Sequence, residues 1–275
     1  MCVSLDLAEF SGTVLYGGRR RHPRYGPIEV LGYQNTATNR ATGPNAMLLH
    51  LPARRLDQRH FVPVGPHAGV LTSMLDAVRP LPVNDGIDWM GEPDEVEVFE
   101  HDVYTVVLAA DPTLITDALS RVPRHKRPRV DPALLAFYRE AFPGHAFAFC
   151  CFDNARAERA KPLLIWYEPV DPERIVLPAL DCHTGAVPDL DAWVSPDHWL
   201  LFGSDDADPE WGEPVEYAPD LDPELGAFLP DRVMGVAYRG TALPNGDFAI
   251  GHADLLRGEL ARVTRLVPQP RRPGR

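Results

Sequence analysis

The sequence predicts an α+β fold that is rich in strands, with mainly antiparallel sheets and a few helices. Short runs of β-branched and aromatic residues, bounded by Gly, Pro, Asn and Asp, outnumber the helical patterns by roughly two or three to one. The two kinds of segment also do not alternate regularly along the chain. Regular alternation is typical of parallel α/β folds, so this order favours antiparallel pairing.

Each predicted strand is a short apolar run with turn residues at both ends. An Asn245-Gly246 pair between the last two runs predicts a hairpin turn. Cys150 and Cys151 are adjacent in one run, so their side chains should point to opposite faces of a sheet. The predicted strands are 3–7, 12–16, 28–33, 46–51, 96–100, 103–109, 146–152, 163–167, 175–177, 199–202, 233–239 and 247–250.

The clearest predicted helix covers residues 131–142. Asp131 is suited to the N-cap, Pro132 to the first helical position, and a Pro-Gly pair at 143–144 stops the helix. A second Asp-Pro start predicts a helix over 111–120. Weaker patterns predict helices over 69–78 and 253–263.

Length and composition indicate one globular α+β domain over residues 1–267, with a disordered tail at 268–275. The net charge is −12, and residues 138–275 carry 13 basic and 23 acidic side chains, a balance of −10. So acidic a chain is poorly suited to bind nucleic acid or an anionic membrane. No apolar run approaches the ~20 residues of a membrane span, and the N-terminus lacks a secretory signal. We therefore expect a cytoplasmic protein.

The four cysteines, in a cytoplasmic chain, should be free thiols, and no Cys-x-x-Cys pair is present. The glycine-rich nucleotide loops, the His-Glu-x-x-His zinc motif and the Gly-x-Ser-x-Gly elbow are absent too. The sequence therefore identifies no cofactor.

Cys2 is the first candidate for chemistry because of its position. Removal of Met1 would leave a thiol beside a free α-amine, which together can act as nucleophile and base. A strand is predicted to follow at once, and 12–16 could pair with it through residues 8–11. The second strand then leads into Gly17-Gly18-Arg19, which could bring a guanidinium near the N-terminus.

This opening resembles that of the N-terminal-nucleophile cysteine amidohydrolases, which include bile-salt and penicillin-V hydrolases and class II glutamine amidotransferases. The resemblance covers about the first 20 residues, and Met1-Cys2 before a strand is its only specific element. It implies an αββα sandwich, a small-molecule substrate, Cys2 as nucleophile and Arg19 as a substrate or terminus contact. Asn45 and Asn154 are loop asparagines that could supply the oxyanion donor. The Asn-x-Asp that follows the arginine in the bile-salt-hydrolase-like enzymes is missing here. The glycine that directly follows the cysteine in the amidotransferases is Val3 in this chain.

A second candidate site lies in Leu180-Asp-Cys-His-Thr-Gly185 and the later Asp197-His198 pair. Asp181, His183 and His198 could be metal ligands, since Asp181 and His183 would share one face of a strand. The alternative is a turn, in which Asp181 and Thr184 bond the backbone before Gly185.

Three functions therefore stay open from the sequence. The first is an amide-bond hydrolase with Cys2 as nucleophile. The second is a metal-dependent enzyme that uses Asp181, His183 and His198. The third is a non-catalytic binding or accessory protein in which all these residues are structural. The sequence does not decide whether the chain is an enzyme.

Overall fold

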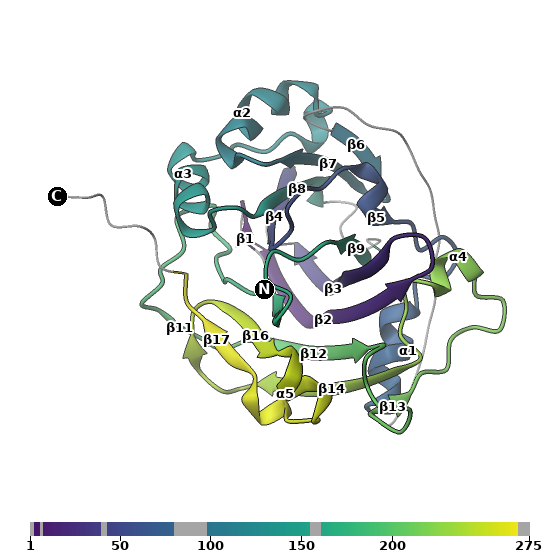
Figure 1. The fold of residues 1–275 in the computed structure, drawn as a ribbon. Helices are drawn as coiled ribbons and strands as arrows, with labels where there is room; N and C mark the ends of the chain where they lie inside the picture. Colours follow the sequence, from purple (N-terminus) through teal and green to yellow (C-terminus); the bar gives the residue numbers. More distant parts are fainter. Residues whose placement is uncertain (1–2, 6–7, 40–42, 80–97, 155–160, 269–275) are drawn as a thin grey trace.

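The computed structural model describes residues 3–5, 8–39, 43–79, 98–154 and 161–268 (Figure 1). Two large sheets dominate it. The five-stranded sheet has the order β1 (Val3–Ser4), β4 (Pro44–Leu51), β8 (Ala146–Asp153), β7 (Tyr104–Ala109), β6 (Val98–His101). The seven-stranded sheet has the order β13 (Glu213–Pro214), β14 (Arg232–Arg239), β12 (Asp197–Ser204), β2 (Ala8–His22), β3 (Gly26–Asn39), β9 (Leu163–Tyr167), β5 (Phe61–Val62).

Two small sheets complete the strands. One has the order β10 (Arg174–Leu177), β16 (Asp247–Gly251), β17 (Thr264–Leu266), and the other joins β11 (Trp193–Val194) to β15 (Leu243–Pro244). Among the described strands, every pairing is antiparallel except that of β2 with β12. The prediction of a strand-rich fold with mainly antiparallel sheets is confirmed.

The main core lies between the inner faces of the two large sheets. Leu15 and Leu31 of the seven-stranded sheet belong to the same buried cluster as Leu49 and Cys150 of the five-stranded sheet. Cys151 instead belongs to the cluster on the other face of β8. The prediction that adjacent Cys150 and Cys151 point to opposite faces is therefore confirmed, as the two-residue period of a strand requires.

Helices cover the outer faces of both sheets. The side chains of α3 (Pro132–Ala141) and α2 (Ile115–Ala118) pack on the five-stranded sheet, and those of α1 (Val70–Ala77) pack on the seven-stranded sheet (Figure 1). The Asp131 carboxylate accepts a hydrogen bond from the amide of Ala133 at 2.9 Å, which confirms the predicted N-cap.

The remaining helices are short. They are α4 (Pro223–Gly226), α5 (His252–Leu256) and the 3-10 turns Gln58–His60, Pro112–Leu114, Leu119–Arg121, Arg124–Lys126 and Leu260–Arg262. The predicted helix over 253–263 is confirmed only in its first half, because α5 ends at Leu256 and positive-φ Gly258 follows. No helix of the described segments is long and apolar enough to span a bilayer.

Two predicted strand pairings are wrong. β1 pairs with β4, with Val3 opposite Leu48, instead of pairing with β2. Residues 8–11, expected to form the turn between them, extend β2 itself. The Asn245-Gly246 pair forms no hairpin either, because β14 pairs with β12 and β13 while β16 pairs with β10 and β17. Local turn preferences were outweighed in both places by long-range pairing.

Cys2 and nearly all of the predicted tail at 268–275 lie outside the described residues. The predicted strand over 3–7 is described only at residues 3–5.

Candidate functional site

The N-terminal strand β1 is held between β4 and a loop from the second half of the chain. The amide of Ser4 donates to the carbonyl of Cys182 at 2.9 Å, and the amide of Gly185 donates to the carbonyl of Ser4 at 3.0 Å. Gly185 has φ +70°, and a Cβ there would lie 2.4 Å from the carbonyl oxygen of Leu5. Glycine is therefore needed at the closest approach of this loop to the strand.

Three polar side chains form a chain of contacts at this place. His183 lies between the other two, with Nε2 2.8 Å from Oδ1 of Asp181 and Nδ1 3.2 Å from the hydroxyl of Ser4. If Nε2 carries the proton that bonds the carboxylate, Nδ1 accepts from the Ser4 hydroxyl. Ser4 has no exposed surface, and His183 and Asp181 are mostly buried.

The contact with His183 also affects the charge of the carboxyl group. Burial alone would raise the pKa of Asp181, but the hydrogen bond from His183 lowers that pKa below its ordinary value. Asp181 is thus an ionised partner that fixes the orientation of the His183 ring. An Asp–His pair of this kind can orient the histidine as a general base, and it can equally well hold the loop against β1.

Asn45 bonds the residue that follows β1, and Asn154 in turn bonds Asn45. The Asn45 carbonyl oxygen accepts from the amides of Leu5 at 3.2 Å and Ala46 at 2.8 Å, and its amide group donates to Asn154 at 3.3 Å. Both asparagines are buried. The two predicted sites, treated as separate in the sequence, therefore meet at residues 3–5.

The loop that covers β1 is itself fixed by Asn245, which sequence reasoning assigned to a turn. Its side chain accepts from the amide of Asp181 at 2.8 Å and donates to the carbonyls of Asp181 at 2.9 Å and Asp189 at 3.0 Å. Its own amide donates to the carbonyl of Ala192 at 3.0 Å. One buried residue thus joins both ends of the segment 181–192.

Asp247, two residues further on, anchors the beginning of the same loop. Its Oδ1 accepts from the amides of Ala179 at 2.8 Å and Leu180 at 3.1 Å, and its Oδ2 lies 2.7 Å from Nε2 of His50 on β4. Sequence reasoning missed Ser4, Asn245 and Asp247. A polar residue between apolar ones in a predicted strand was the available signal for Ser4, and a carboxylate at the start of an apolar strand was the signal for Asp247.

We call the set Ser4, Asn45, Asn154, Asp181, His183 and Asn245 the N-terminal clamp. His198 is not part of it. It is fully buried on β12, its ring lies 6.1 Å from that of Phe248, and burial lowers its pKa strongly. Among the residues that the structure describes, no group of three His, Cys, Asp or Glu side chains could hold a metal ion. The predicted ligands Asp181, His183 and His198 are therefore not brought together as one ligand set.

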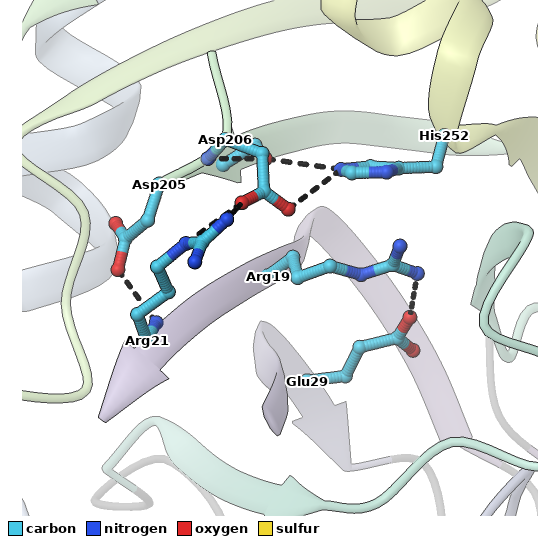
Figure 2. Close-up of polar contacts among 7 residues, drawn as sticks. Arg19, Arg21, Glu29, Asp205, Asp206 and His252 are labelled. Atoms are coloured by element: carbon cyan, nitrogen blue, oxygen red, sulfur yellow. Dashed lines mark hydrogen bonds and ion pairs between the residues drawn. The ribbon is translucent and has the colours of Figure 1, made fainter. Parts of the chain in front are cut away.

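Arg19 lies in the second half of β2, and Figure 2 shows it bonded to Glu29. It is opposite Ser204 on β12, whereas Thr13 is opposite His198, and six residues of strand span about 20 Å. Its guanidinium bonds the buried Glu29 carboxylate at 2.7 Å. The expected route of this arginine run to the N-terminus, through pairing of the first two strands, is wrong because β1 pairs with β4, and Cys2 itself lies outside the described residues.

The neighbours of Arg19 are also occupied. Arg20 pairs with Asp205, and His252 lies 3.1 Å from the Ser204 hydroxyl. Figure 2 shows the pairing of Arg21 with Asp206. A nearby open hollow of about 580 Å³ is lined by Asp208, Pro209, Glu210, Trp211, Leu256 and Arg257. No clamp residue lines this hollow.

Comparison with known proteins identifies no family for this chain. No family model matches the chain, and no curated protein matches it. Among solved structures, the chain is similar to the crystal structure of baculovirus P35, with 12% identity, a TM-score of 0.47, and coverage of 97% of this chain and 95% of that one. Two structures of a mutated baculovirus P35 after caspase cleavage give 11% identity each. One has a TM-score of 0.48 and covers 88% of this chain and 98% of its own. The other has a TM-score of 0.44 and covers 94% of this chain and 95% of its own. The function must therefore be argued from the chain's own side chains.

Proposed function

We propose that this protein is a non-catalytic binding protein in which the N-terminal clamp is a structural device. The observation that carries the proposal is the burial of Ser4 between two bonded neighbours. Its amide and its carbonyl both bond the loop, and its hydroxyl contacts His183. The Ser4 side chain thus holds the loop on β1, and a fully buried hydroxyl offers a substrate no approach.

The other clamp residues also support a structural role for the clamp. Asn45 accepts from the backbone on β4, and Asn245 bonds only backbone groups of the loop. Buried polar groups that are satisfied in this way stabilise a unique local conformation. A clamp of this kind holds the segment 181–192 rigid, and a rigid loop loses less entropy when it binds a partner.

The proposal is tested by replacing His183 with glutamine and comparing it with the exposed His125. His183→Gln should lower the free energy of unfolding by about 1–2 kcal/mol, since two hydrogen bonds are weakened, and His125→Gln should leave it unchanged. Urea unfolding measures both. Wild-type turnover of amide substrates that His183→Gln abolishes at unchanged stability would overturn the proposal.

One observation favours a second candidate, the amide-bond hydrolase. The His183–Asp181 pair contacts Ser4 on the strand that begins directly after Cys2, so an oriented imidazole is available near the N-terminus. Asn45 would then serve as oxyanion donor, and an αββα arrangement of sheets and helices would follow. An electrophilic amide probe should label Cys2 in this case, with labelling lost in Cys2→Ala.

A further inference from the structure

Exposed apolar side chains gather at one edge of the molecule. Of the described residues, five large apolar side chains are strongly exposed, and Trp193, at 70%, is the most exposed of them. Two others, Val187 and Val267, come from segments beside it, whereas Leu114 and Val170 lie in other segments of the chain. Single exposed apolar residues are normal on a protein surface, but a group around an exposed tryptophan indicates an interaction surface.

Contacts of the backbone place Trp193 and Val267 in neighbouring segments. Trp193 on β11 is opposite Pro244 on β15, and the Arg265 side chain on β17 donates to the Pro244 carbonyl at 2.9 Å. Val267 directly follows β17, and a Cβ at Gly246 would lie 3.2 Å from its Cα. Figure 1 shows β11 and β17 at the same edge, near the end of the described chain.

Val187 lies in the loop that Asn245 closes between Asp181 and Asp189. The same asparagine bonds Ala192, directly before Trp193. The clamp therefore fixes the backbone from which Val187 and Trp193 project. We call Val187, Trp193 and Val267, with the exposed Asp189 and Asp191, the Trp193 face.

The Trp193 face carries the negative charges of Asp189 and Asp191. Asp189 and Asp191 form no ion pair with any residue in the described part of the chain, although Oδ1 of Asp189 accepts from the amide of Asp191 at 3.0 Å. The nearby Asp197 is instead paired with Arg239 at 2.8 Å. An indole ring beside two unpaired carboxylates matches a guanidinium, which can stack on the ring and bond a carboxylate at the same time. Two copies of this face would bring like charges together, and that disfavours self-association.

We propose that the Trp193 face docks a protein partner through an arginine-containing segment. An arginine of the partner stacks on Trp193 and pairs with Asp189 or Asp191, and apolar neighbours in the partner contact Val187 and Val267. This inference rests on the proposed binding function, since it names the surface and the partner chemistry. The clamp supplies the rigidity of this surface.

The probe is a synthetic peptide with alternating arginine and leucine, with a glutamate-for-arginine peptide as control. Binding to the full chain is followed through the backbone amide and indole NMR signals, which report even millimolar affinities, and the amide signals remain in Trp193→Ala. The arginine peptide should shift the Trp193 signal, and binding should weaken as salt is raised. Trp193→Ala should weaken binding by roughly tenfold or more, Asp189→Asn with Asp191→Asn severalfold, and Leu114→Ala not at all.

Equal binding by wild type and Trp193→Ala, or equal binding of both peptides, would overturn the inference. So would a dimer that Trp193→Ala abolishes, because a second copy would then occupy the face. The test leaves Cys2 and His183 untouched. Catalysis at Cys2 would therefore disprove the proposed function without changing the peptide result, and failure of the peptide to bind would leave the clamp's structural role in place.

Discussion

The hydroxyl of Ser4 lies 3.2 Å from Nδ1 of His183, although 179 residues separate them in the chain. This contact joins the first described strand to a loop from the second half of the protein. Closing so long a segment costs chain entropy, which local sequence preferences do not offset. Buried hydrogen bonds and the packing of β1 on β4 must stabilise it, and the following predictions test these contributions.

Asn245→Ala should lower the free energy of unfolding by roughly 2–4 kcal/mol, because three side-chain hydrogen bonds are lost and buried backbone groups are left unsatisfied. Urea unfolding gives the change in stability, and hydrogen exchange at the Asp181 amide should become faster. Asn245→Asp retains the acceptor but places a buried carboxylate oxygen against the two carbonyls, so it should be at least as destabilising. A loss below about 0.5 kcal/mol would show that the loop does not depend on this residue.

Gly185→Ala should be more destabilising than Gly144→Ala. Both glycines have positive φ, at +70° and +82°, so both substitutions should carry a backbone cost of about 1–2 kcal/mol. Only at Gly185 would the new methyl group also meet a backbone oxygen, that of Leu5, at 2.4 Å, whereas nothing lies within 4 Å at Gly144. Equal losses of stability in the two variants would contradict the close contact between this loop and β1.

Glu29 should make stability depend on pH near neutrality. Burial raises its pKa from 4.5 to about 7, more than the adjacent Arg19 lowers it. The folded chain then holds a proton that the unfolded chain has released, so the free energy of unfolding falls as pH rises from about 4.5 to 7. Relative to Glu29→Gln, wild type should lose stability between pH 5 and pH 7 in urea unfolding. A relative gain over this range would mean that the Arg19 ion pair keeps Glu29 ionised.

The thiols should react at very different rates in a Cys2→Ala background. Cys150 and Cys151 are fully buried, and burial raises the pKa of Cys151 strongly, so neither should react before unfolding. Cys182 is partly exposed and should react first. A colorimetric thiol reagent should therefore titrate one cysteine in the folded chain and three in urea. Fast reaction of a second thiol would show that the five-stranded sheet opens locally.

Most elements of this fold could be predicted from the sequence, because their signals are local. The Asp131-Pro132 helix start and the alternation at Cys150 and Cys151 depend on neighbours in the chain. The partners of the strands depend on distant segments, so the Asn245-Gly246 pair was interpreted as a hairpin turn although Asn245 binds residues 181–192.

The candidate site shows the same division. Asn45, Asn154, Asp181 and His183 were all identified by residue type, but as two separate sites. Their meeting at β1 follows from the pairing of β1 with β4, which no spacing in the sequence encodes. Arg19 was assigned to the N-terminus for the opposite reason, since its strand was expected to pair with β1.

The central claim is that the clamp around β1 is structural and not catalytic. The rate at which an electrophilic amide probe labels Cys2 tests it most directly, in wild type and in His183→Gln. The account predicts rates within about threefold of each other and of a cysteine in an unfolded peptide. A wild-type rate about a hundredfold above that of His183→Gln, a difference typical of a lost general base, would contradict it.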